Sequence, residues 1–269
     1  MDLSELEKQR LECWCQDGKH SVPDPTAAVD FINKVGICPL YKASDEFPDL
    51  FHAHTSDPTQ VPDASWDSIS GEIYTWRWKI GGTDGAFYAA LVAKKPTWVA
   101  WKLLPDVLTA FMDRRTPDEL FDLGLLSADG HKIAAVLEEA GGVLSTKDLR
   151  KEAGFPTGKE NRKSFLKAVE ELESFLWLAK KTSEGVDDMS HAYIPTFYKA
   201  QSEQAYNSDP ADGLKAVLGA YIEVAKFVRP LPFAKAFRIK AEAVESAATS
   251  LGLSQLEESG KTIYYKENN

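Results

Sequence analysis

Hydrophobic and polar positions in the second half of the chain follow a pattern that occurs twice. In each copy, a helix-length amphipathic run is followed by a short helix, a polar turn, a longer helix and an apolar hairpin. The first copy begins at Ser127 and the second at Asp212. Three helices followed by a two-stranded wing are the outline of a winged helix-turn-helix, a module that most often presents one helix to a nucleic-acid groove. The pattern predicts a helix-rich α+β fold that contains tandem winged helix-turn-helix units.

Both copies divide into the same series of elements. In the first copy we expect three helices and two wing strands at residues 127–140, 147–153, 159–175, 176–182 and 192–197. In the second copy we expect them at residues 212–226, 231–236, 239–251, 253–257 and 262–266. Ser145 precedes the second helix of the first copy, and its short polar side chain is typical of a helix cap.

The first 113 residues have a weaker pattern. They predict helices and short extended segments at residues 1–15, 27–35 (capped by Thr26), 37–41, 97–101 and 103–112, with a short helix near 49–52. Residues 86–93 look helical. The best linker candidate is residues 114–117. We therefore divide the chain into a degenerate N-terminal winged-helix-like domain at 1–113, a winged helix at 114–208 and a C-terminal winged helix at 209–269.

Residues 72–80 alternate strictly between two classes of side chain and predict a strand. One face of that strand would carry Tyr74, Trp76 and Trp78, and the other would carry Arg77 and Lys79. Adjacent aromatic and cationic faces could stack a base and hold phosphates. The alternative is a core strand with an exposed polar face, which the frequency of aromatic residues in protein cores favours.

The third predicted helix of the first copy is rich in cations. They are Lys159, Arg162, Lys163 and Lys167. Three of them share a face at helical spacing, as they must to meet one phosphate backbone. The alternative is a solvated face of salt pairs, because four glutamates lie along the same helix. We expect DNA contacts from these four side chains, from Arg77 and Lys79, and from Lys261 at the wing tip of the second copy.

The net charge of −10 argues against simple electrostatic binding to nucleic acid. The charge is uneven, because the first 113 residues carry 10 basic against 17 acidic side chains and the remainder has a balance of −3. A second hypothesis is therefore an interaction scaffold that binds a protein partner or a small ligand and no nucleic acid. A pocket lined by Cys38, Tyr41, Trp76 and Trp78 would then hold a base-sized ligand.

Motifs of several enzyme and metalloprotein classes are missing from the sequence. It contains no Walker loop, GxSxG, HExxH or GxGxxG. Cys13, Cys15 and Cys38 lack the paired spacing of zinc ligands, so we expect no metal and no cofactor. Few and unpaired cysteines are typical of the reducing cytoplasm. No window reaches the roughly 20 apolar residues that span a bilayer, so we expect a cytoplasmic protein without a membrane partner.

Two segments resemble a known family. Residues 29–41, VDFINKVGICPLY, are similar to the helix and LGxxQxQ or LGxxQxD motif of AlkZ-type proteins. Those proteins are DNA glycosylases built from tandem winged helices, and they excise alkylated or crosslinked bases. Residues 94–105, KKPTWVAWKLLP, resemble the HEASLLP stretch of that family. The VGxCxLx and KKPTxV patterns resemble more closely a smaller group of AlkZ-related proteins, which implies winged helices, a DNA partner and a role in DNA repair.

Other residues stand where the resemblance places the catalytic groups of the family. The catalytic Gln falls at Pro39, its partner Gln or Asp at Tyr41, and the His and Glu of the second motif at Val99 and Ala100. In the family those groups would position water and stabilise the charge that builds as the glycosidic bond breaks. Pro39 can do neither, and Tyr41 is a poor base near neutral pH.

The sequence therefore favours a protein that binds double-stranded DNA, damaged or distorted, without base-excision chemistry. The sequence favours a DNA-binding protein without catalytic activity over an enzyme. If the chain is an enzyme, it is a DNA glycosylase-like hydrolase with a displaced acid, Asp45 or Glu46.

Overall fold

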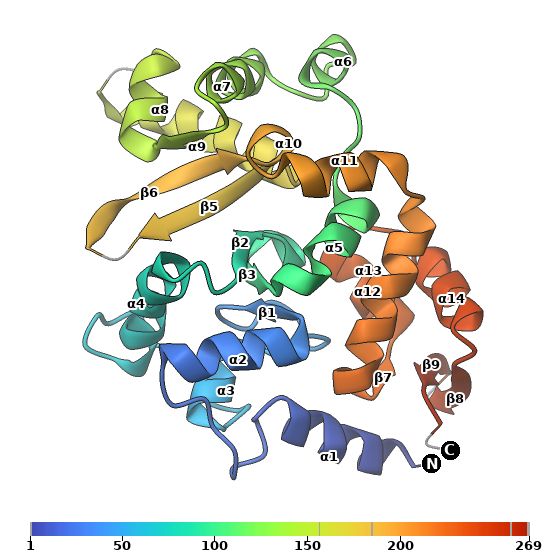
Figure 1. Ribbon diagram of the computed structural model, residues 1–269. Helices are drawn as coiled ribbons and strands as arrows, with labels where there is room; N and C mark the ends of the chain where they lie inside the picture. The colour runs from blue at the N-terminus through green and yellow to red at the C-terminus, as the bar shows by residue number, and fades with distance from the viewer. Residues whose placement is uncertain (1, 156, 184, 259, 268–269) are drawn as a thin grey trace.

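The same order of elements occurs three times along the chain (Figure 1). The computed structural model describes residues 2–155, 157–183, 185–258 and 260–267. Each repeat of the order consists of a helix, a short strand, two further helices and a two-stranded wing. The fold is a helix-rich α+β arrangement of tandem winged helix-turn-helix units. No helix among the described residues is long and apolar enough to cross a membrane.

The first unit follows a leading helix, α1 (Leu3–Cys13). Its elements are α2 (Pro25–Val35), β1 (Ile37–Pro39), α3 (Leu50–Thr55), α4 (Ile69–Gly82), β2 (Phe87–Ala90) and β3 (Pro96–Val99). Short helical turns and a connecting helix lie around its end: η1 (Val92–Lys94), η2 (Trp101–Leu103) and α5 (Leu104–Phe111). Asp24, and not Thr26 as predicted, caps α2, because its carboxylate accepts from the backbone N–H groups of Thr26 and Ala27.

Two predictions in the first unit are wrong. Residues 72–80 belong to helix α4, whose buried positions Ile73, Trp76 and Ile80 recur at helical spacing. Residues 86–93 form β2 and the turn η1 instead of a helix. β2 is buried along its whole length between two neighbouring strands, so its tertiary surroundings override the helical preference of its alanines.

The second unit begins after α6 (Pro117–Asp122). Its elements are α7 (Ala128–Glu139), β4 (Val143–Ser145), α8 (Thr146–Glu152), α9 (Lys159–Ser174), β5 (Leu178–Ser183) and β6 (Val186–Tyr193). The predicted helices are confirmed, and Ser145 caps α8 by accepting from the N–H of Asp148. Residues 194–197, predicted as the end of the wing, form helix α10 (Ile194–Phe197), and α11 (Lys199–Asn207) follows it.

The third unit matches the predicted order and adds one short strand. Its elements are α12 (Pro210–Ala225), β7 (Phe227–Val228), α13 (Pro230–Phe237), α14 (Ala241–Ser250), β8 (Ser254–Glu258) and β9 (Lys261–Tyr265). Strands β4 and β7, which the sequence did not predict, occupy equivalent places, since each pairs with the second strand of its own wing.

The wings of the first two units join in one antiparallel sheet. Its strand order is β1-β3-β2-β5-β6-β4, so the two units contribute mirrored halves. The halves meet where Ala89 of β2 pairs with Ala179 of β5. The third unit has a separate sheet, β7-β9-β8, and one hydrophobic core contains residues of all three units. The division into domains at 1–113, 114–208 and 209–269 stays a prediction about which parts fold independently.

Candidate functional site

Strand pairing brings the two motif segments of the first unit together. β1 pairs with β3 so that Ile37 lies opposite Val99, and the N–H of Ala100 donates to the carbonyl of Gly36 at 2.8 Å. Pro39, Val99 and Ala100 are all buried. None of these three side chains has a hydrogen-bond donor or acceptor. The two segments where the resemblance places the family's catalytic groups therefore lie on paired strands, but Pro39, Val99 and Ala100 are apolar.

Tyr41 is the one polar side chain among those motif positions. Its hydroxyl donates to the carbonyl of Ser70, at the start of α4, at 2.7 Å. Burial raises the pKa of the Tyr41 phenol above its usual value. The side chain is half-buried, and its ring lies 6.1 Å from the ring of Phe51. These contacts fix the orientation of the ring and keep its phenol protonated.

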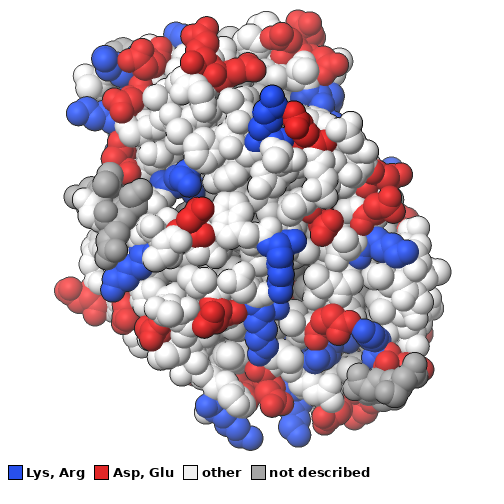
Figure 2. All heavy atoms as spheres, in the orientation of Figure 1, with Lys and Arg blue, Asp and Glu red and all other residues white. Residues whose placement is uncertain are grey.

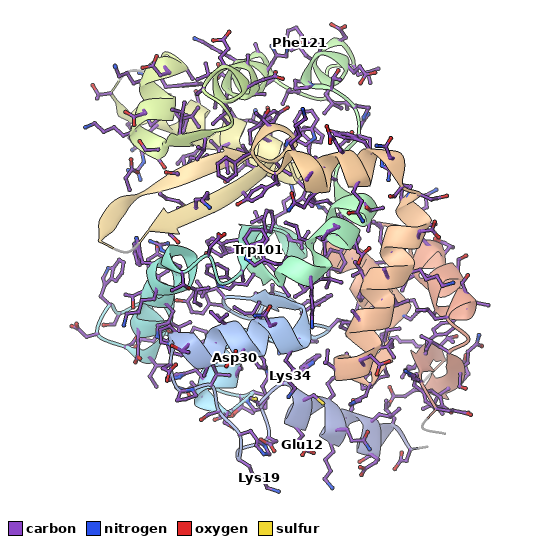
Figure 3. All side chains as sticks on the ribbon, in the orientation of Figure 1. Glu12, Lys19, Asp30, Lys34, Trp101 and Phe121 are labelled. Atoms are coloured by element: carbon purple, nitrogen blue, oxygen red, sulfur yellow. The ribbon has the colours of Figure 1, made fainter. Side chains whose placement is uncertain are left out.

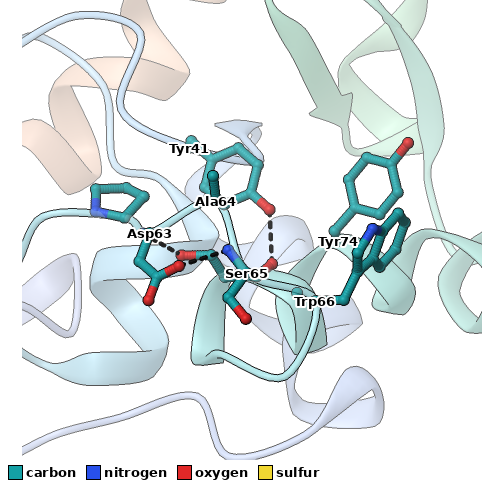
Figure 4. A pocket seen from close by; sticks show the side chains of 9 residues that line it. Tyr41, Asp63, Ala64, Ser65, Trp66 and Tyr74 are labelled. Carbon is teal, nitrogen blue, oxygen red and sulfur yellow. Dashed lines mark hydrogen bonds between the residues drawn. The ribbon is translucent and has the colours of Figure 1, made fainter.

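A cavity of about 380 Å³ opens beside Tyr41, and we call it the aromatic pocket (Figure 4). Its walls are Tyr41, the loop from Pro62 to Trp66, and the first turns of α4 with Ser70, Gly71 and Tyr74. The Trp66 and Tyr74 rings meet edge to face, with centroids 5.3 Å apart. Three aromatic rings from three separate segments therefore surround one cavity.

Of the four residues predicted to line a pocket, only Tyr41 lines this one. Cys38 and Trp76 are buried in the core of the first unit, and burial raises the pKa of the Cys38 thiol. Trp78 is half-buried, and its ring packs edge to face on that of Tyr74 at 5.8 Å. Sequence reasoning missed Trp66. The signal was present, because it is a lone tryptophan in a stretch rich in proline, aspartate and serine.

The predicted separation of aromatic and cationic faces is wrong, because α4 is a helix. The guanidinium carbon of Arg77 lies 3.5 Å from the ring centroid of Tyr74 and 4.0 Å from that of Trp78. Such cation–π contacts hold the cation against its own helix. Lys79 is exposed near the C-terminal end of α4, where it remains accessible to a ligand.

The four predicted cations of the second unit lie on α9, and all of them are exposed. Within the described ranges, none of Lys159, Arg162, Lys163 and Lys167 forms an ion pair with a carboxylate. The alternative of a salt-paired face is therefore not seen in this structure. Lys261 is exposed at the start of β9. On the face drawn in Figure 2, basic and acidic side chains alternate, and neither covers a large continuous area.

A family model described as AlkZ related matches residues 22–200, which include both motif segments and nearly all of the first two units. The chain belongs to the AlkZ-related family. No curated protein sequence matches it. The solved structure of the Streptomyces sahachiroi DNA glycosylase AlkZ is similar in fold, with a TM-score of 0.58 and 10% sequence identity. That likeness covers 99% of this chain and 70% of the AlkZ chain.

In this AlkZ-related protein, helix α8 supplies further cations that the sequence analysis missed. A hollow of about 780 Å³ between α8, the turn before α9 and the wing is lined by Lys147, Arg150 and Lys151 together with Asp188. The signal was the presence of three cations, Lys147, Arg150 and Lys151, within five residues of one predicted helix. In a helix-turn-helix, the helix before the recognition helix crosses the nucleic-acid backbone.

The two acids named as displaced catalytic groups differ in their surroundings. Glu46 is buried, and its carboxylate accepts from the Tyr221 hydroxyl at 2.8 Å. The same carboxylate lies 3.5 Å from Arg10 and 3.5 Å from Arg229. Burial alone would lower the pKa of Arg229, but the attraction of the Glu46 carboxylate raises it above its usual value. Asp45 is exposed and pairs with Lys42 at 2.7 Å.

Asp49 and His52 are a buried acid–histidine pair in the first unit, and both ring nitrogens of His52 have hydrogen-bond partners. Nδ1 of His52 lies 2.7 Å from the Asp49 carboxylate, and Nε2 lies 2.9 Å from the carbonyl of Gln60. With both ring nitrogens bonded, His52 has no atom left for a metal ion. Across the described parts of the chain, no three His, Cys, Asp or Glu side chains gather as metal ligands do.

Proposed function

We propose that this AlkZ-related protein binds double-stranded DNA, damaged or distorted, through the exposed face of α9. The observation that carries the proposal is a set of four exposed cations on the third helix of a winged-helix unit, none of which forms an ion pair with a described residue. Free cations at helical spacing can release counterions from a phosphate backbone, and this release supplies much of the affinity for DNA. Lys147 and Lys151 of α8 are exposed and line the hollow beside the turn before α9, and they are further candidate contacts together with Lys79 and Lys261.

We also propose that the protein lacks the base-excision chemistry of its glycosylase relative. Excision needs a polar group that positions water and a charge that stabilises the oxocarbenium-like sugar as the base departs. Pro39, Val99 and Ala100 offer neither, and the Tyr41 phenol is held protonated against Ser70. Glu46 is already surrounded by Tyr221 and two arginines, so it is not free to act as a base.

Fluorescence anisotropy with labelled duplexes tests the binding proposal. The set includes a perfect duplex, one with an abasic analogue and one with a bulged base, each titrated with salt. If four cations meet phosphates, a plot of log affinity against log salt has a slope of about −3 to −4. Absence of binding at low salt contradicts the proposal. Incubation with an alkylated duplex followed by alkaline cleavage tests the second part, and strand breaks above background would show that excision chemistry is present.

The net charge of −10 favours a second candidate, a winged-helix scaffold that binds a protein partner and no nucleic acid. The same titration separates the two candidates. Salt-sensitive binding that is lost on reversing charges of α9 supports DNA, and lack of binding to every duplex supports the scaffold.

A further inference from the structure

The loop before α4 exposes an unusual amount of apolar surface. Val61 is 81% exposed, Trp66 is 69% exposed and Ile69 is 40% exposed, and all three lie within nine residues of sequence. Single exposed hydrophobic side chains are common on protein surfaces, but a group of them beside a cavity is typical of a binding site. This group adjoins the aromatic pocket, because Trp66 is one of its walls (Figure 4).

The loop that carries Trp66 is fixed by local contacts. The N–H of Asp63 donates to Ser70 Oγ at 2.9 Å, and the hydroxyl of Ser68 donates to the carbonyl of Ser65 at 2.7 Å. Gly71 permits this close approach, because a Cβ atom there would lie 2.1 Å from the carbonyl oxygen of Trp66. The exposure of Trp66 is therefore built into the fold of the loop.

The rings of the pocket are held in place before any ligand arrives. The hydrogen bond to Ser70 fixes the Tyr41 ring, and Tyr74 is packed by Arg77 and by the edge of Trp66. The guanidinium carbon of Arg77 lies 3.5 Å from the Tyr74 ring centroid, and Arg77 does not line the cavity. Rigid aromatic walls favour a flat ligand, because a planar ring can stack or meet them edge to face with little loss of entropy.

A polar group at the same cavity adds a preference for a hydrogen-bond donor. Asp63 lines the pocket, and one of its carboxylate oxygens accepts from the N–H of Ser65. Its second oxygen takes no hydrogen bond from any described residue. That oxygen can accept from a ligand N–H group.

We propose that the aromatic pocket binds a planar heteroaromatic ring that carries an N–H group, of the size of a nucleobase. The volume of about 380 Å³ is within the range of small-ligand pockets, ~300–1,000 Å³. The ring is either a free nucleobase or nucleoside, or a base unstacked from a nucleic acid. Binding of a free nucleobase or nucleoside does not depend on DNA binding through α9. Binding of an unstacked base rests on that proposed function.

The fluorescent nucleoside 2-aminopurine riboside is a direct probe, because stacking on an aromatic ring quenches its emission. We expect saturable quenching by the full chain. Trp66→Ala weakens this binding by roughly tenfold or more, since base–aromatic stacking has about that effect. Trp66→Phe keeps a ring in place and restores most of the affinity. Asp63→Asn weakens it by roughly threefold through the lost acceptor charge.

Phe121→Ala is the matched control for removing an exposed aromatic ring. Phe121 is 43% exposed and lies on α6, away from α4 (Figure 3). It does not line the aromatic pocket, so the variant leaves the quenching unchanged. An equal loss in Phe121→Ala and Trp66→Ala contradicts a specific site.

A second arm uses a duplex with 2-aminopurine in a bulge and a matched duplex with the probe base-paired. Quenching that depends on Trp66 in the nucleoside arm assigns a free ring, and quenching only in the bulge arm assigns an unstacked base. If neither arm depends on Trp66, the pocket proposal is wrong, even where α9 still binds the duplex. If the duplex does not bind at all but the nucleoside does, DNA binding fails and the pocket stands.

Discussion

In both the first and the second winged-helix unit, the third helix packs against the sheet that the two units share. α4 reaches the wing of its neighbour, where the hydroxyl of Thr182 donates to the carbonyl of Arg77 at 2.6 Å. Its buried side chains Ile73, Trp76 and Ile80 belong to the core of the unit, and its first turns form one wall of the aromatic pocket. α9 instead buries one stripe and leaves its cations in solvent. The common topology sets where the helix lies, and its side chains decide what it can contact.

The wing of the second unit is longer than the wing of the first unit. β2 and β3 are four residues each, and β2 is covered by β5 of the second unit. β5 and β6 have six and eight residues and extend past that junction. A wing must project to enter a groove beside its recognition helix. The second unit of the shared sheet therefore combines the longer wing, whose Thr182 contacts α4, with an exposed basic helix.

The largest expected effect is on the attachment of the first unit to the third. Glu46→Ala removes the carboxylate between Arg10 and Arg229 and leaves a buried guanidinium without its counter-charge. Breaking such a buried pair costs about 3–5 kcal/mol. Urea denaturation followed by circular dichroism measures the loss. Asp45→Ala is the matched control, with an expected change of about 0–1 kcal/mol because its carboxylate is exposed. Equal stability of the two variants would show that the cluster does not anchor the unit.

Two buried histidines give the units opposite dependence on pH. In the second unit, burial and the nearby Lys180 lower the pKa of His191 to about 4. The contribution of the neutral ring to the free energy of unfolding is therefore complete above pH 6.5 and is lost as the pH falls from 6.5 toward 4. A shift of this size corresponds to about 3 kcal/mol. Urea midpoints across that range measure it, and His191→Phe removes much of the slope if the assignment is correct.

The sequence predicted the second and third units well and the first unit poorly, for physical reasons. The stripe of Phe165, Val169 and Leu172 repeats at helical spacing, and Ser145 marks a helix start. In α4, aromatic and charged residues alternate as they would in a strand. The helix nevertheless buries Trp76 on one face and stacks Arg77 on the Tyr74 ring on another. Strands β4 and β7 have three and two residues, which is too short for a period to show.

The candidate site was predicted only in part. Tyr41, one of the four residues expected to line a pocket, lies beside a cavity, and the α9 cations are exposed. Trp66 and the cavity itself depend on how the loop folds back over Gly71, a contact between backbone atoms that no side-chain pattern records.

Charge reversal on α4 and on α9, the third helices of the first two units, tests which of the two helices contacts DNA. We expect Lys159→Glu with Lys163→Glu to lower affinity for duplex DNA by roughly tenfold or more at low salt, and the salt slope to fall by about 2. Stability does not change, because neither cation has an ion-pair partner among the described residues. Lys79→Glu on α4 is the comparison, and we expect a smaller loss of affinity. Anisotropy measures both variants, and a larger effect of Lys79→Glu would assign the main DNA contact to the first unit.

The smallest effect concerns His52, which holds the start of the loop that forms the aromatic pocket. Burial lowers its pKa, but the hydrogen bond and charge of Asp49 raise it by more, so the net shift is upward. Gln60 also favours the protonated ring, and Lys42 opposes it. The contribution of His52 is therefore complete below pH 6.5 and is lost as the pH rises through the raised pKa. The protection of the amides of residues 57–68 against exchange should fall as the pH rises through that pKa, because the ring no longer donates to both acceptors. His52→Gln removes this dependence and leaves the acid-side slope of His191 in place. If both slopes vanish together, the two histidines do not report separate units.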